Sequence, residues 1–162
     1  MDIEEQDFTK SLLRILDYVL LTEEMALSKG YFAALSVAEL HTLDAIGPYG
    51  DRSMSETATI LGVTTGTLSV AVDRLVKKEY VQRRRDENDR RVVRICLTRS
   101  GKLAYRMHGK FYTLLVKRLM EPLDMQQQML LKNMIRDIDS FMIDQYSKYK
   151  QQEIEQVNKK ED

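Results

Sequence analysis

A polar stretch near the middle of the chain combines short hydroxyl side chains with one valine and one arginine. Its members, counted along an expected helix, are Thr65, Thr67, Ser69, Val70 and Arg74. Hydroxyls hydrogen-bond to base edges or phosphates, a valine contacts the methyl group of thymine, and an arginine suits guanine or phosphate. We therefore expect this helix to enter a groove of DNA. Thr64 precedes the helix, where a threonine acts as a cap, and is a further candidate contact.

The residues on either side of this stretch predict a helix-turn-helix. Ser53 and Glu56 have the spacing of a capping box, which begins a helix over residues 54–61. Gly62 ends that helix, and the second helix follows over residues 65–78. The apolar face of the second helix consists of Leu68, Ala71, Val72 and Leu75. Ser53 is also a candidate DNA contact, because it lies at the start of this unit.

Two strand-like segments follow, over residues 81–85 and 92–97. Alternate residues of the second segment are apolar, as in a strand with one buried face. Residues 86–89 between the segments are turn-forming. The pattern predicts a β-hairpin, which forms a wing beside the two helices.

The predicted wing is rich in arginine. Arg90 lies at its tip, where a cation can enter the minor groove and sense the narrow shape of A/T-rich DNA. Arg84 is one of three consecutive arginines that alternate in direction along a strand, so that one or two of them are expected to meet phosphate. Arg91 has two candidate roles, a DNA contact or an ion pair with Asp73 or Asp89 that holds the wing against the helix.

Replacing Arg90 with alanine is expected to weaken DNA binding by about 1–3 kcal/mol, the size of a good groove contact. A titration of the operator at fixed salt measures this change. Unchanged operator affinity would contradict the assignment of Arg90 to the minor groove.

The distribution of charge supports a nucleic-acid partner although the formal net charge is zero. Residues 74–110 contain thirteen Lys and Arg against four Asp and Glu, whereas residues 1–60 contain four basic and eleven acidic residues. Salt screens the interaction between a phosphate and distant charges, so the local charge of the protein surface matters more than the net charge of the chain. The basic surface around the wing is therefore the expected electrostatic footprint of double-stranded DNA.

The remaining sequence is helical in pattern and predicts a mainly α fold. Helices are expected over residues 8–27, 37–46, 99–119 and 125–146. The wide apolar stripe of the first and last of these helices exceeds the need of one small core, so we expect a homodimer. The predicted organisation is an N-terminal dimerisation helix (1–35), a winged helix-turn-helix domain (36–100), C-terminal dimerisation helices (101–147) and a polar tail (148–162).

These motifs resemble the MarR family of bacterial winged-helix regulators over residues 8–146. The family pattern Asp-x-x-Asp-x-Arg is met by Asp86, Asp89 and Arg91, and Leu-Thr-x-x-Gly is met by Leu97, Thr98 and Gly101. One departure is Asn88, where many members carry another arginine; Asn88 is kept as a candidate DNA contact. The resemblance implies a homodimeric repressor that binds a pseudo-palindromic operator.

Within the family, residues 39–47 and 105–112 look like the branch of FabT-type repressors of fatty-acid synthesis genes. This likeness implies long-chain acyl-acyl carrier protein as a corepressor and no other required cofactor. Candidate residues for an effector pocket are Met25, Leu40, Leu43, Ile46, Leu103, Met107, Phe111 and Leu114. A basic surface that would dock the acidic carrier protein consists of Arg99, Lys102, Arg106 and Lys110. Ordinary core packing remains the alternative for the apolar set.

Zinc is the alternative effector, although no metal site is favoured. Glu24, His41 and His108 fall where zinc-sensing members of the family place ligands, but Tyr112 stands where a further histidine would be expected. Three such side chains with water as the fourth ligand would complete a zinc site.

Several other classes of protein are not expected. The sequence contains no phosphate-binding loop with the Gly-Lys-Ser/Thr signature, no nucleophile elbow and no HExxH motif, so an enzyme is not expected. No apolar run is long enough to span a bilayer, and the acidic N-terminus lacks the apolar region of a signal peptide. These features predict a cytoplasmic protein without a membrane partner.

Overall fold

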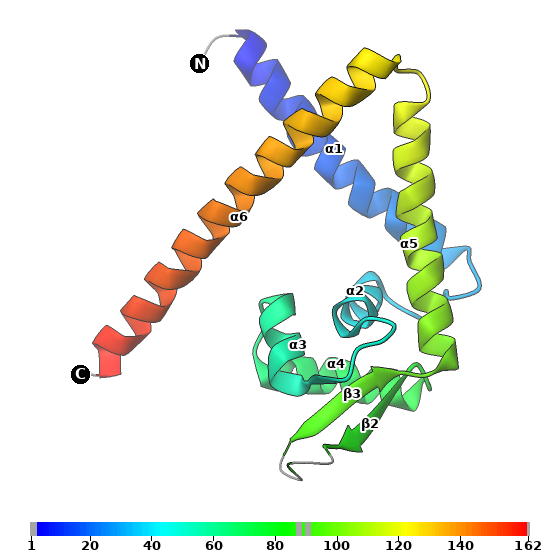
Figure 1. The fold of residues 1–162 in the computed structure, drawn as a ribbon, viewed down its shortest axis with the longest axis vertical. Coiled ribbons are helices and arrows are strands. Elements are labelled where there is room, and N and C mark those ends of the chain that lie inside the picture. The colour runs from blue at the N-terminus through cyan, green and yellow to red at the C-terminus, as the bar shows by residue number, and fades with distance from the viewer. Residues whose placement is uncertain (1–2, 87–88, 90–91, 162) are drawn as a thin grey trace. The chain divides into compact units, whose positions relative to one another are not determined.

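The computed structural model describes the backbone of residues 3–86, 89 and 92–161. The chain divides into two compact units, Met1–Thr113 and Leu114–Asp162. The elements, in chain order, are α1 (Ile3–Ser28), α2 (Val37–Ile46), β1 (Arg52–Ser53), α3 (Met54–Leu61), α4 (Thr65–Lys77), β2 (Val81–Arg85), β3 (Val93–Leu97), α5 (Arg99–Met120) and α6 (Met125–Glu161) (Figure 1). The predicted mainly α, winged helix-turn-helix fold is confirmed.

The wing is part of a three-stranded antiparallel sheet with the order β1-β3-β2. Strand β3 pairs with β2 from Val81 opposite Leu97 to Arg85 opposite Val93, as a hairpin requires. It also pairs with β1, where Arg52 lies opposite Ile95. The sequence did not predict β1, because two residues are too few to show the alternation of a strand.

The core of the first unit lies where α2, α3 and α4 meet the sheet. Its most deeply buried side chains are Leu43, Ile46, Leu68, Val72, Leu75 and Ile95. Three of these were predicted as the inner face of the second helix of the helix-turn-helix, and this prediction is confirmed. The burial of that face fixes which residues of α4 remain exposed.

Residues that flank the helices cap their ends with hydrogen bonds. The Ser53 hydroxyl accepts a hydrogen bond from the Glu56 backbone N–H at 3.2 Å, and Glu56 accepts one from the Ser53 N–H at 2.7 Å, which confirms the capping box. Gly62 ends α3 in the left-handed conformation, with φ of 65°. An equivalent capping box at Ser36 and Glu39, of which only the serine was predicted, begins α2.

The start of α5 explains the Leu-Thr-x-x-Gly pattern. The Thr98 hydroxyl accepts a hydrogen bond from the Gly101 N–H at 3.1 Å and donates to the Glu79 carbonyl at 2.7 Å. The Gly101 Cα faces the backbone of Tyr80 so closely that a Cβ would lie 2.1 Å from the Tyr80 carbonyl oxygen. Thr98 and Gly101 therefore join the wing to α5 by backbone contact.

Glu79, between α4 and β2, has a φ of 64°, in the left-handed region that favours glycine. Replacing Glu79 with glycine is expected to raise the free energy of unfolding by about 0.5–1 kcal/mol, because relief of the Cβ clash exceeds the entropy that glycine adds to the unfolded chain. Urea denaturation measures the change. Glu79→Ala is the control, since it keeps the Cβ and should bring no gain; equal stability of the two variants would contradict the expectation.

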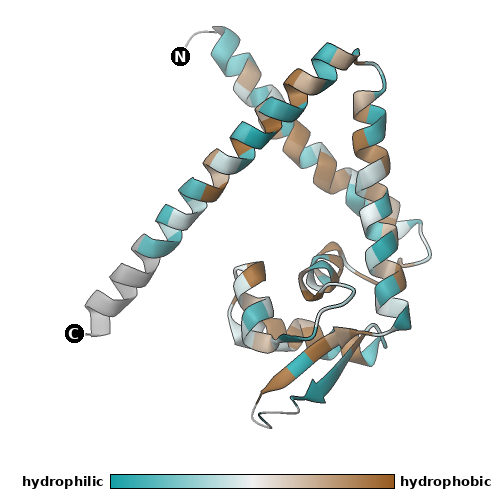
Figure 2. Cartoon of the chain, viewed as in Figure 1, coloured by the Kyte–Doolittle hydropathy of each residue, from teal (hydrophilic) through white to brown (hydrophobic). Residues whose placement is uncertain are grey.

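Helix α1 exposes most of its apolar side chains in the first unit. The large ones that are exposed are Phe8, Leu12, Leu13, Ile15, Leu16, Tyr18, Leu20, Leu21 and Met25. In the second unit, α6 likewise exposes apolar side chains, several turns in succession, as the brown bands in Figure 2 show. Exposed apolar surface of this extent marks an interaction site.

Helix α6 continues past residue 146, where the sequence pattern was expected to end, as far as Glu161. The added residues are mostly Lys, Gln and Glu, which favour helix without an apolar face. Among the described residues no single helix is both long and apolar enough to cross a membrane; only α3 and α4 taken together, bent by 105° at their junction, pass on length and composition.

Candidate nucleic-acid interface and a buried ionic cluster

The predicted DNA contacts on α4 extend from its first turn to Arg74 in its last turn. Thr65, Val70 and Arg74 are exposed and Ser69 is half-buried. The Thr64 hydroxyl accepts from the Thr67 backbone N–H at 3.1 Å and lies 2.9 Å from the Thr67 hydroxyl. Thr64 therefore caps α4, as predicted, while both hydroxyls stay exposed.

Ser53 is less available than these residues. Its hydroxyl donates to the Glu56 carboxylate at 2.8 Å in addition to accepting the cap hydrogen bond. Both hydrogen-bonding functions of the Ser53 side chain are thus used within the capping box. A DNA contact by Ser53 stays a prediction. It would require the Ser53 hydroxyl to give up one of these bonds or to form a bifurcated hydrogen bond.

Ion pairs connect the wing to its surroundings. Arg83 in β2 pairs with Asp73 in α4, and its other terminal nitrogen lies 3.5 Å from the Ser69 hydroxyl. Asp73 thus pairs with Arg83 among the described residues. The pairing predicted for Arg91, with Asp73 or Asp89, lies outside the described residues and stays a prediction. Arg83 precedes the tip of the wing in the chain, and its side chain reaches α4 because β2 lies beside that helix. Arg83 is the described residue that joins the wing to α4.

Two further arginines of the sheet contact the segment before β1. Arg84 donates through Nε to the Asp51 carboxylate at 2.9 Å, and Arg94 donates to the Asp51 carbonyl oxygen at 2.6 Å and pairs with Asp86. Bonding to Asp86 and burial have opposite effects on Arg94, and the bonding prevails, so the pKa of Arg94 is raised. A phosphate contact by Arg84 remains a prediction and would compete with Asp51.

The tip of the wing lies outside the described residues. Asn88, Arg90 and Arg91 were all predicted to contact DNA there, and these predictions remain untested. Asp89 is described, and its backbone N–H donates to the Asp86 carboxylate at 2.9 Å. This bond begins the turn that the sequence of residues 86–89 predicted.

The residues predicted to line one effector pocket are divided by the structure. Leu40, Leu43 and Ile46 lie in the core, with at most 4% of each side chain exposed. They are buried because α2 directs them toward α3, α4 and the sheet. Their burial agrees with the alternative of ordinary core packing, and a role in an effector pocket stays a prediction. The others lie on long helices: Met25, Leu103 and Met107 are exposed, Phe111 is half-buried, and Leu114 is exposed in the second unit.

A groove of about 280 Å³ lies elsewhere, between α2 and α4. Its lining includes His41 and Thr42 of α2, Val63 of the turn, and Thr67 and Arg74 of α4. None of the predicted pocket residues lines it. Two candidate DNA contacts thus border a hollow in the first unit.

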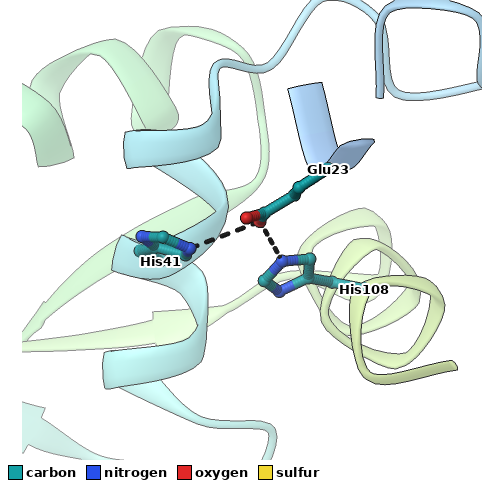
Figure 3. A group of neighbouring side chains, drawn as sticks. All are labelled: Glu23, His41 and His108. Atoms are coloured by element: carbon teal, nitrogen blue, oxygen red, sulfur yellow. Dashed lines mark hydrogen bonds and ion pairs between the residues drawn. The ribbon is translucent and has the colours of Figure 1, made fainter. Parts of the chain in front are cut away.

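A buried ionic cluster joins α1, α2 and α5 in the first unit. His108 of α5 lies between two carboxylates: its Nε2 is 2.5 Å from Glu23 Oε1 in α1, and its Nδ1 is 2.6 Å from Asp44 Oδ2 in α2. Tyr112 donates its hydroxyl to Glu23 Oε2 at 2.7 Å, and His41 Nε2 lies 3.3 Å from Glu23 Oε1. Figure 3 shows Glu23 between the two histidine rings. Only 2% of the Glu23 side chain and 4% of the His108 side chain are exposed.

The cluster shifts the protonation of its members. The hydrogen bond to Asp44 raises the pKa of His108 despite burial, and Glu23 adds to the effect. Burial alone would raise the pKa of Glu23, but bonds from Tyr112 and His108 prevail and lower it. Burial and the bond to Glu23 raise the pKa of Tyr112 to about 12. Both ring nitrogens of His108 face a carboxylate oxygen, and ionised carboxylates only accept hydrogen bonds, so the site is suited to a doubly protonated imidazolium.

The acidic member of the histidine cluster is Glu23, not Glu24 as the sequence suggested. Successive residues of an α-helix point about 100° apart, so only one of two adjacent glutamates can face inward, and Glu24 is exposed. The ligand atoms of Glu23, His41 and His108 lie within 4.8 Å of one another. The cluster was thus located by its histidines, and its carboxylate was misassigned by one residue.

Comparison with known sequences agrees with this geometry. The sequence profile of the MarR family matches residues 35–93. Two Bacillus subtilis proteins described as uncharacterized HTH-type transcriptional regulators are similar. YpoP is 36% identical over 67 residues, which are 41% of this chain and 48% of YpoP. YcgE is 40% identical over 65 residues, which are 40% of this chain and 42% of YcgE. The chain thus matches somewhat less than half the length of these curated relatives.

Solved structures match over a greater length. Streptococcus pneumoniae FabT, in a crystal structure with DNA, has a TM-score of 0.81 and 31% identity, and the match covers 86% of this chain and 98% of that one. A MarR family protein from Bacillus stearothermophilus has a TM-score of 0.73 and 20% identity, with 88% and 99% covered, which shows the fold alone. The FabT structure is 31% identical over 98% of its length, and the MarR profile matches the helix-turn-helix and most of the wing. Together these matches show that this chain belongs to the MarR family.

Proposed function

We propose that the protein is a transcriptional repressor that binds a pseudo-palindromic DNA operator as a homodimer. The observation that carries the proposal is the exposed, hydroxyl-rich start of α4 beside a wing held by Arg83 and Asp73. A helix with this surface can enter the major groove while the wing lies over the backbone. The similarity to a FabT structure solved with DNA supports the same partner.

The homodimer is supported by the exposed apolar side chains of α1 and, separately, of α6. Burial of such a surface stabilises an assembly by about 25 cal/mol per Å². Two reading units per dimer match two half-sites about one helical turn apart. Sedimentation at micromolar concentration tests this point, and a stable monomer would contradict it.

Selection from random DNA duplexes tests the repressor proposal without a known operator. The expected product is a two-fold related site whose half-sites are centred about 10 base pairs apart. Arg74→Ala should then weaken binding to this site by about 1–3 kcal/mol, whereas Lys29→Ala, which removes the same charge from the loop before α2, should not. Failure to enrich any sequence over competitor DNA would exclude a sequence-specific repressor.

We further propose that the regulated genes are those of fatty-acid synthesis, with long-chain acyl-acyl carrier protein as corepressor. The basic side chains Arg99, Lys102, Arg106 and Lys110 of α5 are suited to an acidic carrier protein. Operator binding should tighten when acylated carrier protein is added and should not change with the unacylated form. Equal responses to the two forms would contradict recognition of the acyl chain.

Zinc is a second candidate effector, favoured by the convergence of Glu23, His41 and His108. Two imidazoles and a carboxylate suit zinc, and Asp44 stands where an outer carboxylate orients a zinc-bound histidine. Binding would require His108 to release its Nε2 proton and the contact with Glu23 to open.

Calorimetric titration of zinc into chelator-treated protein tests this candidate. One zinc ion per chain, bound with release of a proton, is the expected result. His41→Asn should weaken binding strongly, whereas Glu24→Gln, a change at the neighbouring exposed glutamate, should not. Absence of binding at micromolar zinc would exclude zinc as the effector.

A further inference from the structure

Helix α1 is attached to the DNA-binding part of its unit through very few buried side chains. Among residues 4–28, Glu23 alone is buried, and Leu27 packs against the edge of the core. The rest of α1 is exposed or half-buried, including the apolar side chains that we assign to the dimer interface. The direction in which α1 leaves the winged-helix core therefore depends largely on what holds Glu23.

Glu23 is held from two other helices at once. His108 and Tyr112 of α5 bond to its two carboxylate oxygens at 2.5 and 2.7 Å. His108 in turn bonds to Asp44 at 2.6 Å, and Asp44 belongs to α2, whose apolar face is part of the core. The chain Glu23–His108–Asp44 thus connects the arm helix α1 to the DNA-binding core through two charge-assisted hydrogen bonds.

Such bonds fix direction as well as distance. A buried imidazolium that donates to a carboxylate on each side has little freedom to tilt, because any unmade bond would leave a buried charge unpaired. Apolar contacts, by contrast, are non-directional. The cluster is therefore better suited to set an angle between helices than the sparse packing around Leu27 is.

We propose that Glu23, His108 and Asp44 act as positioning residues that set the angle between α1 and the winged-helix core, and thereby the separation of the two recognition helices in the dimer. This inference rests on the proposed function, since it requires a dimer that reads two half-sites. One base pair of spacing changes the separation by about 3.4 Å, so a loosely held arm would accept several spacings and a fixed arm only one.

Three operator duplexes, with the half-sites at the selected spacing and at one base pair more or less, separate these cases. Binding is measured by fluorescence anisotropy in chelator-containing buffer, so that no metal contributes. Wild-type protein should prefer the selected spacing by about tenfold or more, a difference near 1.4 kcal/mol. His108→Gln and the milder Asp44→Asn, at a half-exposed position, should each reduce the preference to about two- to threefold.

A duplex with a single half-site supplies the control for folding. Both variants should bind it as wild type does, because neither residue lies on the DNA-reading face. Arg74→Ala is the opposite control: it should weaken binding to all four duplexes and leave the spacing preference intact. The salt dependence should be unchanged in His108→Gln, because the number of phosphate contacts stays the same.

The outcomes distinguish this inference from the proposed function. If wild-type protein shows no specific binding, the dimeric repressor itself is contradicted. If wild type binds specifically but equally well at all three spacings, the arm is not fixed and the positioning role is overturned. If wild type prefers one spacing and both variants retain that preference, the positioning role is overturned. Equal weakening on every duplex, including the single half-site, would also overturn it, because the cluster would then support only the local fold.

Discussion

Replacing Gly101 with alanine should lower the free energy of unfolding by about 3 kcal/mol, near the upper end of overpacking effects. The new Cβ would lie 2.1 Å from the carbonyl oxygen of Tyr80, 3.1 Å from its carbonyl carbon and 3.2 Å from the Leu97 Cβ. Two of these atoms are backbone and the third belongs to a buried strand residue, so no rotation of a side chain relieves the overlap. Helix α5 would have to move away from β2 and break the Thr98 contacts.

The same helix supplies a matched control. An added Cβ on Gly109 would have no neighbour within 4 Å, and alanine in an exposed helix interior is favoured over glycine by about 1 kcal/mol. Gly109→Ala should therefore stabilise the protein while Gly101→Ala destabilises it. Urea denaturation of both variants measures the contrast, and two changes of the same sign would contradict the close approach at Gly101.

Replacing His108 with alanine should cost about 3–5 kcal/mol of folding free energy, because it leaves the buried Glu23 carboxylate without its main cationic partner. The effect is larger than the loss of two hydrogen bonds, since the unpaired charge must be desolvated in the folded state. His41→Ala is the control: His41 also faces Glu23 but is 42% exposed, and an exposed pair contributes less than about 1 kcal/mol. Urea midpoints at pH 7 compare the two variants.

The contribution of the cluster should depend on pH in a defined direction. His108 has a raised pKa in the folded state, so its contribution is complete below the unfolded value of 6.5 and is lost as the pH rises through the raised folded value. Glu23 has a lowered pKa, so its contribution is present above 4.5 and is lost as the pH falls through the lowered value. The difference in stability between wild type and His108→Ala should therefore be greatest between these limits and should shrink at alkaline pH. A difference that grows with alkaline pH would contradict the imidazolium.

Much of the winged helix-turn-helix could be predicted because its signals are local. Capping boxes, a glycine after a helix and alternation in a strand each involve residues within four positions of one another, and α3, β2 and the cap at Thr64 were correctly predicted in this way. Strand β1 was missed because its two residues form a strand only through pairing with β3, far along the chain. The pairing of Arg83 with Asp73 was missed for the same reason.

The ionic cluster could be predicted only in part, because the sequence does not reveal which side of α1 faces the other helices. His41 and His108 could be selected as unusual residues, but the choice between Glu23 and Glu24 depended on the rotation of α1 about its axis. The apolar pattern of α1 could not fix that rotation, because nearly all sides of the helix carry apolar residues and most remain exposed. Asp44 carried no signal that related it to a histidine 64 positions away. Tyr112 was noted only as standing where a further histidine would be expected, and its bond to Glu23, 89 positions away, was not predicted.

Ser53 belongs both to the sheet that contains the wing and to the helix-turn-helix. Its backbone pairs with Arg94 in β3, while its side chain closes the first turn of α3. Opening of the sheet at this point would uncap the helix, and fraying of the helix would free the strand, so the two should exchange their amide protons as one cooperative unit. In such a unit a force on the wing is transmitted directly to the start of the helix-turn-helix, so the wing supports α3 mechanically and does not move independently of it.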